Sequence, residues 1–171
     1  MDPQNIPGLL GGGNMNVVFD LDGTLIDSAP DIRAVASTIL RDLGREGLSL
    51  AETRSFVGEG SMVFVSRMMA SRHIEETAEL RQQLYEEFVT RYERAVDLAV
   101  FYPGVPDTLA ALRADGHRLG LCTNKPERPA RAVLRHMRLE SLFDAFLAGG
   151  MLDSRKPEPD MLNATIAASE P

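Results

Sequence analysis

Two aspartates that directly follow a short apolar run are the residues of this sequence best suited to chemistry. Residues 17–19 are Val-Val-Phe, and Asp20, Leu21 and Asp22 come next, before Gly-Thr at 23–24. The pattern predicts a buried parallel strand that ends in a turn, and open α/β sheets bind their ligands at such carboxyl ends. Residues two apart leave a strand on the same side, so we expect the two carboxylates to lie close together.

Two close carboxylates resist joint ionisation unless a cation or a shared proton stabilises them. We therefore predict a Mg²⁺ ion held by Asp20 and Asp22, an arrangement in which one carboxylate attacks an electrophile and the other transfers a proton. An aspartate-rich turn that caps the strand would use the same residue types for local hydrogen bonding alone.

Thr123 and Lys156 are the next positions that could bind an anion. Thr123 follows the apolar run 118–122, where a hydroxyl and backbone N–H groups can meet a phosphate oxygen, although a threonine that only caps a helix would look the same. Lys156 stands in a loop stiffened by Pro157 and Pro159, before a predicted helix. A lone lysine is most often a solvated surface charge, so spacing alone does not assign it a role.

The elements that must position these residues alternate between strand and helix, with one long helical interruption. Three-and-four spacing of apolar residues predicts helices over 31–43, 48–56, 61–69 and 74–98, then over 106–115, 128–138 and 160–168. Strands are predicted at 118–122 and 146–149, besides the first. We expect an α/β fold with a Rossmann-like parallel-sheet core (residues 15–28 and 99–171) and an inserted all-helical cap (29–98). Residues 1–14, rich in Gly and Pro, are interpreted as a leader or flexible arm.

Composition excludes several classes of partner. The 171 residues carry a net charge of −7, which argues against nucleic acid. No apolar run approaches the roughly 20 residues that span a bilayer, and no signal peptide is evident, so we expect a cytoplasmic protein without a membrane partner. The single cysteine, Cys122, lies in an apolar run and is expected to be a buried, inert thiol.

Three stretches resemble the motifs of the haloacid dehalogenase superfamily. Residues 19–28, Phe-Asp-Leu-Asp-Gly-Thr-Leu-Ile-Asp-Ser, resemble its first motif. Residues 121–126 resemble the second, in the Thr-Asn-Lys-Pro form that is frequent in phosphoglycolate phosphatases. Residues 156–159, Lys-Pro-Glu-Pro, resemble the third.

The resemblance implies a Mg²⁺-dependent phosphatase that acts on small phosphate monoesters such as 2-phosphoglycolate. In the mechanism that it implies, Asp20 attacks phosphorus to form an aspartyl-phosphate. Asp22 protonates the leaving alcohol and then activates water. Thr123 and Lys156 hold the phosphoryl group, and Asn124 belongs to the same substrate-binding motif. A sugar phosphomutase would use the same residues, whereas a dehalogenase would not need Asp22 as an acid.

Two positions in the predicted cap also resemble substrate-binding features of phosphoglycolate phosphatases. Gly58 lies in a Val-Gly-Glu-Gly stretch at 57–60 that resembles a loop of that type of cap. Arg67 follows at a helical distance and could meet a substrate carboxylate. A plain turn and an exposed arginine explain the two residues equally well.

The acidic fourth motif of the superfamily has no match in this sequence. We therefore expect a core shortened at its C-terminal side, weaker metal binding, and an unpaired edge on the first strand at which a second copy could pair. A phosphate-binding or interaction protein with impaired catalysis is the alternative that this difference favours.

Overall fold

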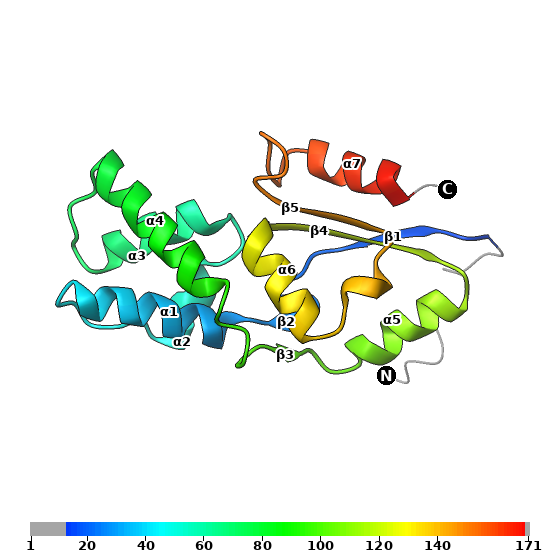
Figure 1. The fold of residues 1–171 in the computed structure, drawn as a ribbon, viewed down its shortest axis with the longest axis horizontal. Helices are drawn as coiled ribbons and strands as arrows, with labels where there is room; N and C mark the ends of the chain where they lie inside the picture. Colours follow the sequence, from blue (N-terminus) through cyan, green and yellow to red (C-terminus); the bar gives the residue numbers. More distant parts are fainter. Residues whose placement is uncertain (1–12, 170–171) are drawn as a thin grey trace.

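A parallel sheet with helices on both faces forms one part of the molecule, and a group of four helices lies beyond one end of it (Figure 1). The computed structural model describes residues 13–169, so the predicted leader lies almost entirely outside the described residues. The strand order is β1-β4-β5 and all pairs are parallel, which confirms the α/β class. The strands are β1 (Asn16–Phe19), β4 (Arg118–Pro126) and β5 (Ala145–Gly149).

Helices cover both faces of this sheet. Figure 1 shows α7 on one face and α5 and α6 on the other. Helix α7 packs closely because Gly120 in β4 has no side chain: an added Cβ there would lie 2.7 Å from Cγ2 of Thr165. The helices and the short 3₁₀ turn of this part are α5 (Val105–Ala114), α6 (Glu127–His136), η1 (Glu140–Leu142) and α7 (Asp160–Ser169).

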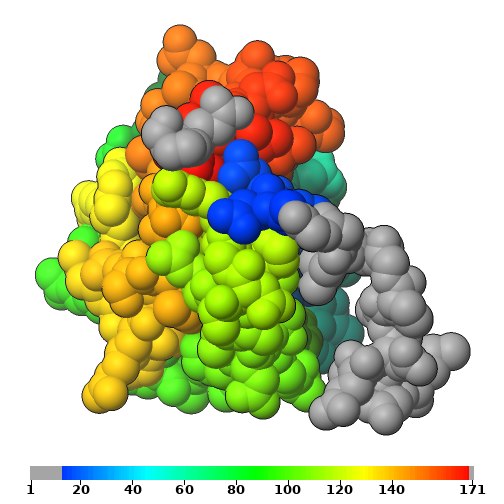
Figure 2. Space-filling view, turned by 90° about the vertical axis from the view of Figure 1, so that its right-hand side faces the viewer, coloured from blue at the N-terminus to red at the C-terminus, as the bar shows by residue number. Residues whose placement is uncertain are grey.

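The end of the sheet away from the helical group is shown in Figure 2, where the start of β1 (blue) lies between α5 (green) and α7 (red). All three strands are parallel, so their carboxyl ends point the other way, toward the helical group. Within residues 13–169, β1 pairs only with β4. Self-association through its other edge stays a prediction. In the same range, no helix is both long enough and apolar enough to cross a membrane.

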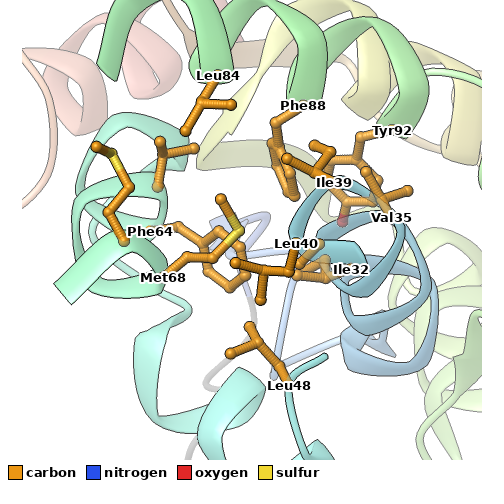
Figure 3. Packing of buried hydrophobic residues seen from close by; sticks show 13 residues of the cluster. Ile32, Val35, Ile39, Leu40, Leu48, Phe64, Met68, Leu84, Phe88 and Tyr92 are labelled. Carbon is orange, nitrogen blue, oxygen red and sulfur yellow. The ribbon is translucent and has the colours of Figure 1, made fainter. Parts of the chain in front are cut away.

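The four helices between residues 29 and 92 have a hydrophobic core of their own. Side chains from α1, α3, α4 and the α1–α2 loop converge in Figure 3, among them Ile39, Phe64, Leu84 and Phe88, and Phe56 of α2 packs against this cluster. This cluster is distinct from the one beneath the sheet. The helices are α1 (Ala29–Asp42), α2 (Leu50–Phe56), α3 (Ser61–Ser71) and α4 (Ala78–Tyr92).

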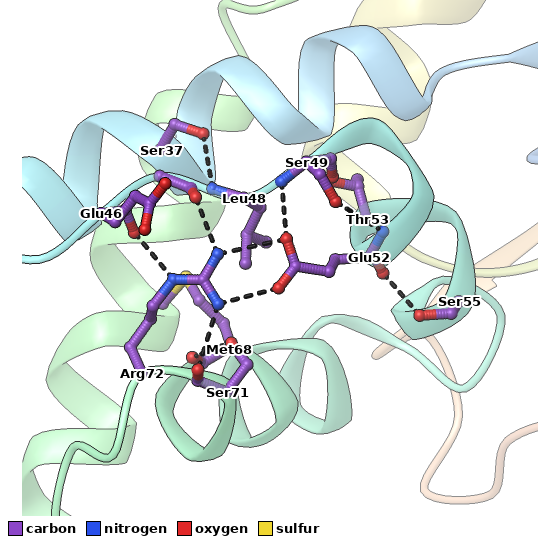
Figure 4. A network of polar contacts seen from close by, with 11 residues as sticks. Ser37, Glu46, Leu48, Ser49, Glu52, Thr53, Ser55, Met68, Ser71 and Arg72 are labelled. Atoms are coloured by element: carbon purple, nitrogen blue, oxygen red, sulfur yellow. Dashed lines mark hydrogen bonds and ion pairs between the residues drawn. The ribbon is translucent and has the colours of Figure 1, made fainter.

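Arg72 fastens the loop between α1 and α2 to the end of α3 (Figure 4). Its guanidinium donates to the carbonyls of Glu46 and Gly47, at 2.9 and 2.7 Å, and to both carboxylate oxygens of Glu52. Glu52 also accepts the Ser49 N–H and completes the capping box of α2. The hydrogen bonds from Arg72 lower the pKa of Glu52 to about 2.

Two short strands join the helical group to the sheet, and the sequence pattern did not predict them. β2 (Ile26–Asp27) pairs antiparallel with β3 (Val100–Phe101). The predicted helix over 74–98 is correspondingly wrong at its end, because α4 stops at Tyr92. Beyond it, the Leu98 N–H donates to buried Asp31, at 3.1 Å, instead of continuing a helix. The pairing of β2 with β3 therefore overrides the local helical periodicity. Burial raises the pKa of Asp31.

Candidate active site

A small cavity lies between the carboxyl ends of the strands and the helical group. It encloses about 40 Å³, room for roughly three waters at about 10–15 Å³ each. Such a volume suits a small ligand. The sheet side contributes Asp20, Asp22, Thr123, Asn124 and Lys125, and the helical side contributes Ile32, Val57, Gly58, Gly60, Ser61, Phe64, Phe88 and Tyr92.

Asp20 and Lys156 form an ion pair at the end of β1. The Lys156 Nζ lies 2.9 Å from Oδ1 of Asp20 and donates to the Cys122 carbonyl at 2.8 Å. The same carboxylate oxygen accepts the Leu21 N–H at 2.8 Å. The Asp20 side chain is 38% exposed, and no contact of its second oxygen is seen within residues 13–169. Two residues 136 positions apart are thus brought together as a carboxylate and its counter-charge.

Thr123 and Asn124 lie where β4 bulges away from β5. Regular pairing stops at Cys122 and resumes at Pro126, opposite Gly149. Gly149 fits beneath the bulge only because it lacks a side chain, since an added Cβ would lie 2.5 Å from the Asn124 carbonyl oxygen. The predicted strand therefore ended too early, and its extension turns the buried Thr123 toward the cavity.

The Asn124 amide joins three segments of the site. Its Nδ2 donates to the carbonyls of Gly58 and Lys156, at 3.1 and 3.0 Å, and its Oδ1 accepts the Lys156 N–H at 3.0 Å. Both amide hydrogens are used in these contacts. The side chain, predicted as a substrate ligand, is thus engaged in holding the 57–60 loop and the Lys156 loop together.

Asp22 faces a cluster of donors. Ser28 donates its hydroxyl to Oδ1 of Asp22 at 2.5 Å, and the Lys125 Nζ lies 3.1 Å from the same oxygen. Lys125 also contacts the Tyr92 hydroxyl and lies 3.9 Å from the centre of that ring. Burial lowers the pKa of Lys125, an effect that Asp22 opposes, and burial raises the pKa of Tyr92 well above its usual value.

Gly58 and Arg67, the two cap residues predicted to bind substrate, have different positions. Gly58 lines the cavity with a positive φ of 123°, a conformation that favours glycine. Arg67 is not among the lining residues. Its guanidinium pairs with Glu59 and donates to the Phe56 carbonyl at 3.4 Å. The structure therefore brings Gly58, but not Arg67, to the other predicted site residues.

Sequence reasoning gave no role to Lys125, Tyr92 or Ser28. Lys125 stands inside the second motif, yet a buried lysine is too rare to expect from position alone. Tyr92 follows Phe88 at a helical spacing, which by itself is typical of the apolar face of a helix. No sequence signal links Tyr92 to residue 125.

Known proteins with similar sequences were found over most of the chain. The family model of haloacid dehalogenase-like hydrolases matches residues 15–170. A phosphoglycolate phosphatase of Cereibacter sphaeroides is 43% identical over 153 residues, which are 89% of this chain and 70% of that protein. The phosphoglycolate phosphatase of Rhodobacter capsulatus is 40% identical over 147 residues, which are 86% of this chain and 67% of that protein.

Solved structures have the same arrangement of elements. A predicted phosphoglycolate phosphatase from Haemophilus somnus superposes with a TM-score of 0.81 at 28% identity, over 88% of this chain and 69% of that one. CbbY from Rhodobacter sphaeroides, solved in complex with phosphate, gives a TM-score of 0.76 at 20% identity, over 91% of this chain and 72% of that one. At that identity, the second likeness concerns the fold alone.

Proposed function

The chain belongs to the haloacid dehalogenase-like hydrolases, and from this premise we propose that it hydrolyses small phosphate monoesters, with 2-phosphoglycolate as its substrate. The observation that carries the proposal is the convergence of Asp20, Asp22 and Thr123 on one cavity, with the Lys156 ammonium 2.9 Å from the Asp20 carboxylate. Phosphoryl transfer needs mainly positioning and neutralisation of charge, which such a set supplies.

In the proposed reaction, Asp20 attacks phosphorus through its second oxygen, the one not held by Lys156 and the Leu21 N–H. The bond from phosphorus to the substrate oxygen breaks as the aspartyl-phosphate forms. Asp22 gives its proton to the departing alkoxide and later takes a proton from the water that releases phosphate. Lys156 and the Thr123 hydroxyl orient the phosphoryl oxygens and stabilise their negative charge.

The donors at Asp20 fit a Mg²⁺ ion held by few protein ligands. The Asp20 carboxylate is partly exposed and would hold the ion, whereas the Asp22 carboxylate faces Lys125 and Ser28. No group of three or more acidic, His or Cys side chains able to hold a metal is found among residues 13–169. Mg²⁺ keeps several waters and favours phosphate oxygens, so such a site suits it when substrate is present. When bound, the ion supplies neutralisation of the phosphoryl charge.

The size of the cavity and a helix start on its wall support a small substrate with a second anionic group. The volume of about 40 Å³ leaves little room beside a phosphoryl group. Gly60 and Ser61 bring the N-terminus of α3, an 11-residue helix, to the cavity wall. Free backbone N–H groups at a helix start favour an anion, which suits the carboxylate of 2-phosphoglycolate.

Phosphate release is the direct test. The protein is assayed with 2-phosphoglycolate and with p-nitrophenyl phosphate, with Mg²⁺ and with a chelator. We expect release that depends on Mg²⁺ and that Asp20→Asn reduces below detection. Asp107→Asn, which changes an exposed aspartate at the start of α5, serves as the matched control and should keep full activity. Unchanged turnover in Asp20→Asn, or no release from any monoester by the folded wild type, would refute the proposal.

A further inference from the structure

Lys125 is a buried cation whose contacts are all internal. Its side chain is 1% exposed, and its Nζ lies 3.1 and 3.4 Å from the two carboxylate oxygens of Asp22. The third direction is taken by the hydroxyl of Tyr92. An ammonium has three hydrogens to donate, so these contacts use its full capacity. Lys125 lines the cavity, but its ammonium is directed at Asp22 and Tyr92.

Burying an ammonium group costs desolvation free energy, which a paired opposite charge offsets. Here the partner is the carboxylate that is proposed as the general acid. Ser28 holds the same carboxylate oxygen from the connection to α1, and Lys125 holds it from β4. Two donors from separate elements therefore restrict the rotation of the Asp22 side chain.

The cluster also crosses the boundary between the two parts of the molecule. Tyr92 is the last residue of α4, whereas Lys125 belongs to the sheet. The ring of Tyr92 lies 3.9 Å from the Lys125 Nζ, which adds a cation–π contact to the hydroxyl contact. The other acidic groups that act on Lys125 are Asp20 and the buried Asp31 at the start of α1.

Resting on the proposed function, we propose that Lys125 is a positioning residue, which holds the Asp22 side chain so that it points at the leaving-group oxygen. The proton moves from the Asp22 carboxyl to the departing alkoxide, and the resulting anion remains beside the ammonium. Tyr92, at the end of α4, contacts Lys125 of β4. The arrangement is therefore complete only when the end of α4 lies against this part of β4.

The test compares two leaving groups in Lys125→Met. The departure of an alkoxide from 2-phosphoglycolate needs a proton, whereas p-nitrophenolate leaves without one. General acid catalysis contributes about 10²–10⁴-fold, so kcat/KM for 2-phosphoglycolate should fall by at least about 10²-fold. The value for p-nitrophenyl phosphate should fall by only a few fold. Arg33→Met, which removes an exposed cation from α1, is the matched control and should leave both values unchanged.

An equal loss on both substrates would overturn the inference, because a merely structural residue does not distinguish leaving groups. A raised KM with unchanged kcat would also overturn it, since that result indicates a direct substrate contact. A wild type that hydrolyses neither ester refutes the proposed function itself, a different outcome. If Lys125→Met does not fold, Tyr92→Phe keeps the ring and removes one contact, and it should show the same selective loss to a smaller degree.

Discussion

Replacing Asn124 by alanine removes the amide that ties the two loops of the site to β4. The three hydrogen bonds lost are those to the Gly58 carbonyl, at 3.1 Å, and to the carbonyl and N–H of Lys156, both at 3.0 Å. The Lys156 loop then lacks this anchor, and the ammonium that lies 2.9 Å from Asp20 keeps only its contacts with that carboxylate and with the Cys122 carbonyl.

The expected cost follows from the hydrogen-bond count. Each bond contributes about 0.5–1.5 kcal/mol, and the freed loop groups regain some hydration, so we expect a net loss of about 1–2 kcal/mol. That loss corresponds to a fall in Tm of about 2–8 °C for a domain of this size. Catalysis should suffer more than stability, because a shift of about 1 Å in a positioning group costs about 10²-fold in rate.

The assay measures thermal unfolding and kcat for 2-phosphoglycolate on the same preparations. Asn163→Ala, on the exposed face of α7, is the matched control and should leave both quantities nearly unchanged. Asn124→Asp should be worse than Asn124→Ala, because it places a carboxylate oxygen beside two carbonyl oxygens. A variant Asn124→Ala with wild-type kcat would refute the positioning role of this amide.

Three further predictions concern stability. The Arg72 hydrogen bonds depress the pKa of Glu52 to about 2 from 4.5, so their stabilisation is present above pH 4.5 and is lost as the pH falls through about 2. Glu52→Gln should flatten that part of the acid dependence in urea unfolding, and equal acid sensitivity in both proteins would contradict this. Gly120→Ala should cost about 1–3 kcal/mol in urea unfolding, because its Cβ would lie 2.7 Å from Thr165 Cγ2; an unchanged midpoint would be evidence against that clash. Phe88→Ala leaves a void in the hydrophobic core of the helical group, beside the cavity. It should lower the free energy of unfolding by about 3–5 kcal/mol, measured by calorimetry. A loss below about 1 kcal/mol would show that the surrounding side chains collapse into the void.

Much of the fold was predictable because most of its elements carry a local signal. Residues 17–19 form a parallel strand at the position expected, although its side chains are only partly buried, and the spacing of Ile32, Val35 and Ile39 marks the buried face of α1. Elements with no such signal were missed. The β2–β3 pair has only two residues on each strand, too few to show a period, and each strand forms because the other is present.

The residues of the candidate site also differ in whether a local sequence signal marks them. The stretches around Asp20, Thr123 and Lys156 indicated phosphoryl transfer through their resemblance to the haloacid dehalogenase superfamily, because each is a contiguous motif. Arg67 has the right charge for a substrate carboxylate, but it forms an ion pair with Glu59 in the loop before α3. Charge type alone cannot show which neighbour a side chain reaches.

The sequence by itself determined the class of fold, the family and the candidate nucleophile, since each depends on local periodicity or on a contiguous motif. Only the tertiary structure decided how the second carboxylate is held. Asp22, Tyr92 and Lys125 come from three distant segments, and the ion pair of Asp22 with Lys125 is strengthened because folding removes the water around it.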